Sequence, residues 1–195
     1  MIKKFYKIGK KLFPLCRSIT GKDTLKTLKI IQQEFKNLKI RSIKSGTKVF
    51  DWTIPPVWDV HDAFILDKYK KKIIDFKKNN LHLISYSEPI NRKLSKNKIL
   101  KKIYTIPKQS NAIPYITSYY KRNWGFCDTH KNKKKIEKKY KDNDSFSAVI
   151  KTSFKKNGYM NYGELFLKGK YKDELLISTY ICHPSMANNE LSGPI

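Results

Sequence analysis

An apolar run near the end of the chain constrains the fold more than any other feature of the sequence. Residues 175–182 read LLISTYIC, without a charged side chain. A short uninterrupted run of this kind is typical of a strand buried on both faces of a sheet, although a buried helical segment has the same hydropathy. Because Ile177, Thr179 and Tyr180 favour strand, the sequence predicts a buried strand here.

A polar loop follows this run directly. His183 comes after the last apolar residue, and Asn189 and Glu190 lie within the next seven positions. In open α/β sheets, ligands gather outside the carboxyl ends of the strands, and imidazole and carboxylate groups both suit Zn²⁺. A second interpretation stays open, in which His183 is a hydrogen-bonded surface residue and Asn188 or Asn189 caps a following helix.

The remaining patterns divide the chain into helical and β-rich parts. Apolar side chains at three- and four-residue steps between 25 and 38 predict the clearest helix. The middle of the chain, about 45–140, is mainly β-rich. Alternation over 144–154 and the Asn157-Gly158 pair predict a strand, a tight turn and a hairpin partner over 159–167. The order of elements predicts an α/β core that is interrupted by a β-rich insertion.

The formal net charge of +26 raises the hypothesis of nucleic-acid binding. Only four of the 42 basic residues are arginine, the residue that base readout and phosphate recognition favour. The lysines are also spread along the chain rather than collected in one arm. A coding bias toward lysine explains this composition better than a selected binding surface, so a specific nucleic-acid partner is the weakest interpretation.

Cysteine usage and hydropathy bear on the cellular compartment. The three cysteines, Cys16, Cys127 and Cys182, lie far apart and form no CxxC pair, which argues against a disulfide framework or a zinc finger. The first residues are basic but lack the apolar stretch of a signal peptide, and the sequence has no apolar run of 18 residues. We therefore expect a cytoplasmic protein without a membrane span.

Four stretches together resemble a known family. They are LFPLCRSITG at 12–21, VFDWTIP at 49–55, AIPYITSYYKRNWGFC at 112–127 and ICHPSMANNELSGP at 181–194. In this order they resemble a bacterial aminopeptidase-like family that is found among polysaccharide-biosynthesis genes and is related to the M28 zinc aminopeptidases. The resemblance extends from about residue 12 to the end of the chain.

The resemblance implies an α/β fold with an M28-type zinc-peptidase core and an inserted small β-rich domain. Residues 1–44 would form the helical start of the core, residues 45–140 the insertion, and residues 141–195 the return to the core. The chain would end before such a core is complete. The implied function is that of the N-terminal portion of a zinc metallohydrolase that acts on peptide or amide bonds.

The same resemblance implies a metal site. His183 would bind zinc, and Asn189 or Glu190 would stand where related enzymes have a bridging carboxylate. The loop of those enzymes reads Asn-Asp-Asn, so Asn189 replaces the bridging Asp. The metal would lower the pKa of a bound water and polarise the substrate carbonyl. The general base would be a Glu on a later loop, so we expect no catalytic base and negligible peptidase activity in this chain.

An alternative from another class is a non-catalytic module that binds carbohydrate or a partner protein in surface polysaccharide biosynthesis. Between 115 and 126, aromatic residues are interleaved with Lys121 and Arg122. Such a stretch can stack on sugars or bases, and it can equally form a packed seam between two domains. Metal content distinguishes the two interpretations, because the enzyme should bind zinc through His183 and the binding module should contain no stoichiometric metal.

Overall fold

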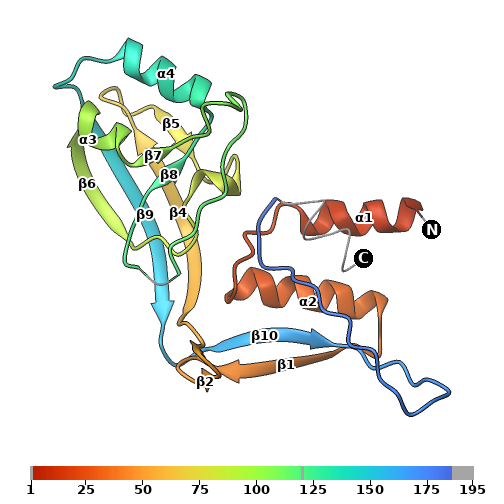
Figure 1. Cartoon of the computed structure of the whole chain (residues 1–195). Helices are drawn as coiled ribbons and strands as arrows, with labels where there is room; N and C mark the ends of the chain where they lie inside the picture. The colour runs from red at the N-terminus through yellow and green to blue at the C-terminus, as the bar shows by residue number, and fades with distance from the viewer. Residues whose placement is uncertain (1, 120, 186–195) are drawn as a thin grey trace. The chain divides into compact units, whose positions relative to one another are not determined.

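The computed structural model describes residues 2–119 and 121–185 and divides the chain into two compact units (Figure 1). Unit 1 consists of Met1–Trp58 with Phe154–Ile195, and unit 2 consists of Asp59–Ser153. The fold is mixed α/β with small sheets. The domain bounds at 44 and 140 that the resemblance implies stay a prediction.

Unit 1 contains two helices and two small antiparallel sheets. Its elements are α1 (Ile2–Leu12), α2 (Lys22–Glu34), β1 (Lys39–Lys44), β2 (Lys48–Val49), β3 (Trp52–Thr53) and β10 (Tyr159–Glu164). Strand β1 pairs with β10 from Lys39↔Glu164 to Lys44↔Tyr159, and β2 pairs with β3. The apolar steps of the two helices meet in a core that we call the helical cluster, which consists of Ile8, Leu12, Leu15 and Ile31.

Unit 2 is built on a four-stranded sheet in the order β5-β4-β9-β6. These strands are β4 (Val57–Leu66), β5 (Lys72–Asp75), β6 (Ile90–Ser95) and β9 (Ser145–Lys155). The alternation predicted for β9 is confirmed, because Phe146, Ala148 and Ile150 are buried while their neighbours are more exposed. The β9 strand pairs with β6 in antiparallel register, from Ile90↔Ile150 to Ser95↔Ser145.

Short helices and a two-stranded parallel sheet complete unit 2. These elements are η1 (Asn80–His82), α3 (Lys96–Leu100), β7 (Ile103–Tyr104), β8 (Phe126–Cys127) and α4 (His130–Lys139). Helix α4 is rich in lysine and buries Ile136 on its inner face. Its N-terminus is capped by Thr129, whose hydroxyl accepts a hydrogen bond from the backbone N–H of Asn132 at 3.1 Å. No helix among residues 2–119 and 121–185 has the length and apolar character that crossing a membrane requires.

The prediction of a buried strand over 175–182 is wrong for this chain. Residues 165–185 have no helix or strand (Figure 1). Leu175, Leu176 and Ile177 are 87%, 90% and 83% exposed. A strand buried on both faces needs neighbouring strands to satisfy its backbone polar groups, and the described residues pair none with this segment. The apolar character of residues 175–182 is therefore not enough to make them a strand.

The predicted hairpin across Asn157-Gly158 is also wrong in its pairing. A turn does separate β9 from β10, as the sequence indicates. However, β10 pairs with β1, which lies more than a hundred residues earlier, and β9 pairs with β4 and β6. The tight turn changes the direction of the chain without returning it along β9.

Candidate functional site

His183 lies at the end of the exposed C-terminal segment, between two residues that anchor it. Ile181 packs against the helical cluster, and Pro184 is buried. The Sγ atom of Cys182 lies 3.7 Å from Nδ1 of His183, and the Tyr180 ring meets the imidazole edge-on at 5.8 Å between centroids. Although it follows a segment without secondary structure, the imidazole thus contacts both Cys182 and Tyr180.

The predicted metal ligands are not brought together within the described residues. Asn189 and Glu190 lie outside them, so the proposed ligand set stays a prediction. Residues 2–119 and 121–185 contain no group of three or more His, Cys, Asp or Glu side chains arranged to hold a metal ion. Because a catalytic zinc site uses three protein ligands, the described residues around His183 do not by themselves fit a zinc ion.

The aromatic stretch of the alternative interpretation packs largely within unit 2. Phe126 is fully buried, and the Tyr119 ring meets Tyr86 edge-on at 4.9 Å between centroids. The hydroxyls of Tyr115 and Tyr119 lie 2.9 Å apart, and burial raises the pKa of Tyr115. Tyr120 lies outside the described residues. Phe126 belongs to the buried core of unit 2, whereas Tyr115 and Tyr119 are half-buried against it. Partial burial of these two rings leaves less open surface for stacking on sugars than the sequence suggests.

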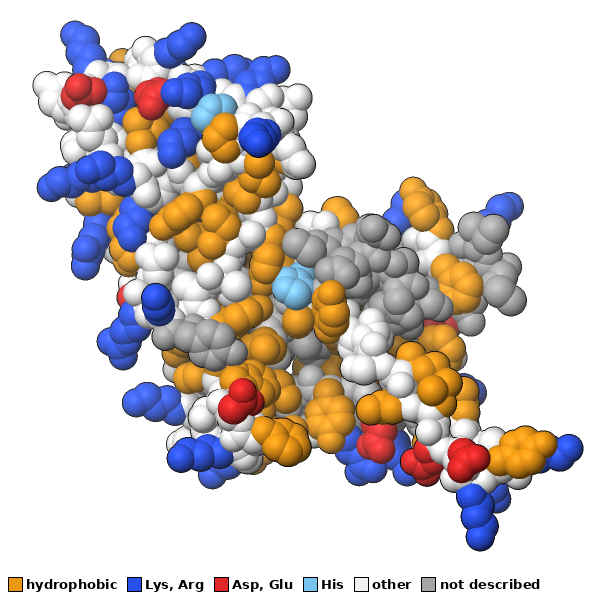
Figure 2. Space-filling model, viewed as in Figure 1, with side chains coloured by type: hydrophobic (Ala, Val, Ile, Leu, Met, Phe, Trp, Pro, Cys, Tyr) orange, Lys and Arg blue, Asp and Glu red, His pale blue; other side chains and the backbone are white. Residues whose placement is uncertain are grey.

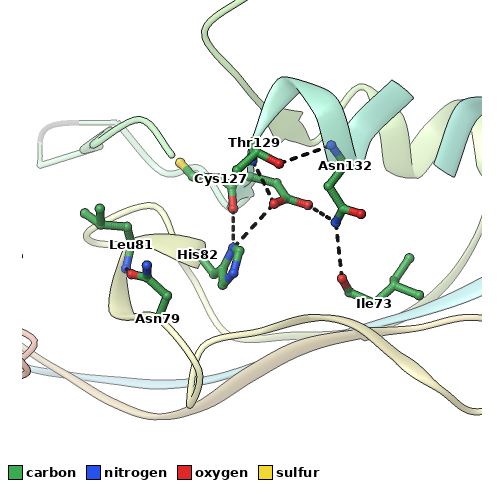
Figure 3. Close-up of polar contacts among 8 residues, drawn as sticks. Ile73, Asn79, Leu81, His82, Cys127, Thr129 and Asn132 are labelled. Carbon is green, nitrogen blue, oxygen red and sulfur yellow. Dashed lines mark hydrogen bonds and ion pairs between the residues drawn. The ribbon is translucent and has the colours of Figure 1, made fainter. Parts of the chain in front are cut away.

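A polar network around Asp128, which the sequence did not predict, joins η1, β5, β8 and α4 of unit 2 (Figure 3). Nδ1 of His82 lies 2.8 Å from the carbonyl oxygen of Cys127 and 3.9 Å from Oδ1 of Asp128. Asp128 accepts hydrogen bonds from the backbone N–H of Thr129 at 2.7 Å and from Nδ2 of Asn132. Burial raises the pKa of Asp128, and these two hydrogen bonds and the His82 charge partly oppose that rise.

The contacts of this network hold the elements of unit 2 together. Asn132 also donates from Nδ2 to the carbonyl oxygen of Ile73 at 3.5 Å, which links α4 to β5 (Figure 3). The Asp128 carboxylate receives protein donors on both oxygens, so its hydrogen-bonding capacity is directed inward. The one signal in the sequence is Asp128-Thr129 directly before the helix, a pairing typical of a capped N-terminus.

Comparisons with known proteins identify the family of the chain and two similar proteins. The family model described as "Domain of unknown function (DUF4910)" matches residues 6–195. A Clostridium acetobutylicum protein named "Putative polysaccharide biosynthesis protein with aminopeptidase-like domain" is 43% identical over 190 residues. That alignment covers 96% of this chain and 42% of the relative.

A solved structure shares the fold. The crystal structure of a "putative peptidase" from Clostridium acetobutylicum superimposes with a TM-score of 0.89 at 43% identity, covering 98% of this chain and 44% of that one. The chain thus spans less than half the length of both relatives. The predicted similarity to aminopeptidase-like proteins associated with polysaccharide biosynthesis is confirmed at this level, while the M28 relationship and the zinc ion stay predictions.

Proposed function

Because the chain belongs to the family described as "Domain of unknown function (DUF4910)", we propose that it is the N-terminal portion of an aminopeptidase-like metallohydrolase that acts on peptide or amide bonds. The observation that carries the proposal is the similarity to a crystallised peptidase-named protein over 98% of the chain, at 43% identity. The two chains therefore agree both in fold and in sequence. The relatives' names supply the reaction class, and the resemblance of residues 181–194 supplies His183 as the candidate residue.

In this proposal His183 provides one ligand of a zinc ion. Its ring is positioned by the Ile181 anchor, and its Nδ1 atom faces the Cys182 thiol. Because the contact of one ring nitrogen sets the role of the other, Nε2 is the nitrogen that we assign to the metal. Glu190 and Asn189 are the proposed further ligands from this chain, and the general base belongs to a later loop.

The test compares two proteins. One is the 195-residue chain, and the other is the product of the reading frame past codon 195, where that frame continues. Zinc content is measured by mass spectrometry, and hydrolysis is followed with aminoacyl 4-nitroanilides with and without a chelator. We expect zinc-dependent release of nitroaniline from the longer product and none from the 195-residue chain. Zinc-dependent turnover by the short chain would overturn its assignment as an incomplete enzyme.

Two histidine variants isolate the proposed ligand. His183→Ala removes the imidazole assigned to the metal, and His61→Ala removes an exposed imidazole from β4 as the matched control. We expect the first variant to lose zinc and activity in the longer product, and the second to retain both. If His183→Ala keeps the full zinc content, the imidazole is not a ligand.

The alternative function is a carbohydrate- or partner-binding module in surface polysaccharide biosynthesis, which the relative's name favours. Phe126 is buried in unit 2 and Tyr115 and Tyr119 are half-buried, so the structure gives this alternative less support than the sequence alone does. Three results for the longer product would together favour this module over the enzyme. The product would lack stoichiometric zinc, would be unaffected by His183→Ala, and would be retained on a glycan column.

A further inference from the structure

A pocket of about 280 Å³ lies in unit 2 between the start of β5 and helix α4. Four lysines line it, Lys71 and Lys72 from the β5 side and Lys135 and Lys139 from the α4 side. Lys135 and Lys139 are one helical turn apart, so both point from the same face of α4. Lysines from two separate segments thus line one concavity.

The positive charge of this lysine pocket is only partly neutralised by the protein. Lys72 contacts Oδ2 of Asp75 at 3.2 Å. Within the described part of the chain, Lys71, Lys135 and Lys139 have no carboxylate at ion-pair distance. Lys and Arg side chains gather over the end of unit 2 where α4 lies (Figure 2). The Lys139 charge also helps to lower the pKa of Asp67, so this carboxylate and Asp75 are the counter-charges near the pocket. Four lysines with two nearby carboxylates leave a positive excess, which a bound anion would offset.

The walls of the pocket are fixed at both ends. At the N-terminal end of α4, Asn132 hydrogen bonds to the carbonyl oxygen of Ile73 in β5. At the C-terminal end, the Tyr140 hydroxyl donates to Oδ2 of Asp67 at 2.7 Å, in the turn that leads to β5. The two backbone segments that carry the lysines are therefore held together before any ligand arrives, so binding does not have to order them.

The floor of the pocket is apolar. Ile136 and Tyr140 are 3% and 5% exposed and line the pocket together with Ile73. Small-molecule sites combine such a floor with a few charged groups, and the pocket's volume of about 280 Å³ is just under the smallest of them, about 300 Å³. The size suits one small molecule, whereas a nucleic acid would need an extended basic surface.

We propose that this lysine pocket binds the phosphate group of a small phosphorylated molecule of sugar-phosphate size. Lysine ammonium groups bind phosphate as point charges, and two or three of them match a phosphate dianion. The apolar floor contacts the uncharged part of the ligand. The pocket lies wholly in unit 2 and does not involve His183, so the inference is independent of the proposed hydrolase function.

Titration calorimetry with glucose 1-phosphate as the probe, at about 150 mM salt, tests the proposal. The double variant Lys135→Gln/Lys139→Gln removes two pocket charges. The matched control, Lys134→Gln/Lys138→Gln, changes the same residue type at the same spacing on the same helix, and neither residue lines the pocket. We expect the pocket variant to weaken binding about tenfold or more and the control to change it less than about twofold. Glucose itself should show no binding.

Three outcomes would overturn the proposal. Equal weakening by both double variants would mean that the general positive field of the protein attracts the probe. Equal binding of glucose and glucose 1-phosphate would mean that the phosphate is not recognised. No binding by the parent chain up to about 10 mM probe, a free energy weaker than about −3 kcal/mol, would mean that the pocket is not a phosphate site. Because these lysines are exposed, the variants should retain the parent's thermal midpoint, which confirms that they are folded.

Discussion

The hydroxyl of Tyr140 donates a 2.7 Å hydrogen bond to Oδ2 of Asp67, a carboxylate that is only 4% exposed. The other oxygen of Asp67 accepts from the backbone N–H groups of Tyr69 and Lys71, both at 2.9 Å. Asp67 thus stabilises the turn before β5 and also binds Tyr140, the residue that follows α4. One buried carboxylate therefore determines both the turn and the position of the helix end.

Replacement of Tyr140 by Phe tests the strength of this link. The variant keeps the ring that meets Phe146 edge-on at 5.0 Å and removes only the donor. A hydrogen bond to a charged group contributes about 1.5–3 kcal/mol, so we expect the free energy of unfolding of unit 2 to fall by that amount in urea titrations. Tyr69→Phe is the matched control, since its ring is 71% exposed. Equal losses in the two variants would show that the Asp67 contact contributes nothing specific.

The same carboxylate makes stability depend on pH. Burial acts to raise the pKa of Asp67, but the hydrogen bonds from Tyr140 and the turn backbone outweigh it and lower the pKa. A group with a depressed pKa in the folded state stabilises the fold fully above its unfolded pKa of about 3.9, and this contribution is lost as the pH falls through the folded value. We expect Asp67→Asn to cost stability at pH 7 and to cost progressively less below about pH 4. A cost that does not change between pH 7 and pH 3 would contradict this assignment.

Local periodicity predicted elements well and pairings poorly. The alternation of Phe146, Ala148 and Ile150 identified β9 and its buried face, because a period of two is a property of the strand itself. The partner of β10 is β1, and nothing in the Asn157-Gly158 turn carries that information. Pairing is decided by which distant strand offers free backbone groups, and this is a property of the whole fold.

The candidate sites show the same division. The position of His183 after an apolar run was evident from the sequence, but the run itself lacks the sheet that the pattern predicted. The contact of His82 with Cys127 joins residues 45 positions apart and left no motif to find. Likewise, the sequence alone does not distinguish Lys71 and Lys135 from the other lysines of a lysine-rich chain. Only the tertiary structure separates lysines that converge on a pocket from those that cover a solvated face.

Gly158, in the turn between β9 and β10, is required because of the space around it and not because of its backbone conformation. The turn motif suggests a left-handed backbone, yet the glycines with positive φ among the described residues are Gly21 and Gly46. At Gly158 an added Cβ would contact Cγ2 of Val57 far inside van der Waals distance and would lie 3.0 Å from Val57 Cβ. Space, rather than backbone conformation, is what excludes a side chain here.

We therefore expect Gly158→Ala to destabilise unit 1 by about 1–3 kcal/mol, the usual cost of overpacking. Val57→Ala removes the obstructing methyl groups, so the double variant should recover part of the loss. Gly169→Ala is the control, because its added Cβ would meet no atom closer than 3.9 Å. Strictly additive losses for Gly158→Ala and Val57→Ala, measured by thermal unfolding, would mean that the two residues do not compete for space.

The three thiols should differ in reactivity in the folded protein. Burial raises the pKa of Cys127 to about 12, with the Asp128 charge adding to the rise, and burial with the Asp23 charge raises the pKa of Cys16 to about 12. At pH 8 such thiols are thiolate in about one molecule in ten thousand, and the thiolate is the nucleophile. We expect iodoacetamide to label Cys182 first under native conditions, as read by peptide mass spectrometry. Faster labelling of Cys127 would contradict the buried placement of β8.

Two isoleucines four positions apart distinguish an exposed C-terminal segment from a buried one. Ile177 is 83% exposed, whereas Ile181 packs against the helical cluster. Exposed positions tolerate substitution within about 0.5 kcal/mol, while loss of a packed isoleucine costs about 1–3 kcal/mol. We expect Ile177→Ser to leave the thermal midpoint unchanged and Ile181→Ser to lower it. Because exposed apolar runs promote association, Ile177→Ser should also reduce light scattering at high protein concentration. A loss of stability in Ile177→Ser as large as that in Ile181→Ser would show that the run is buried in the free chain, as the sequence pattern alone predicts.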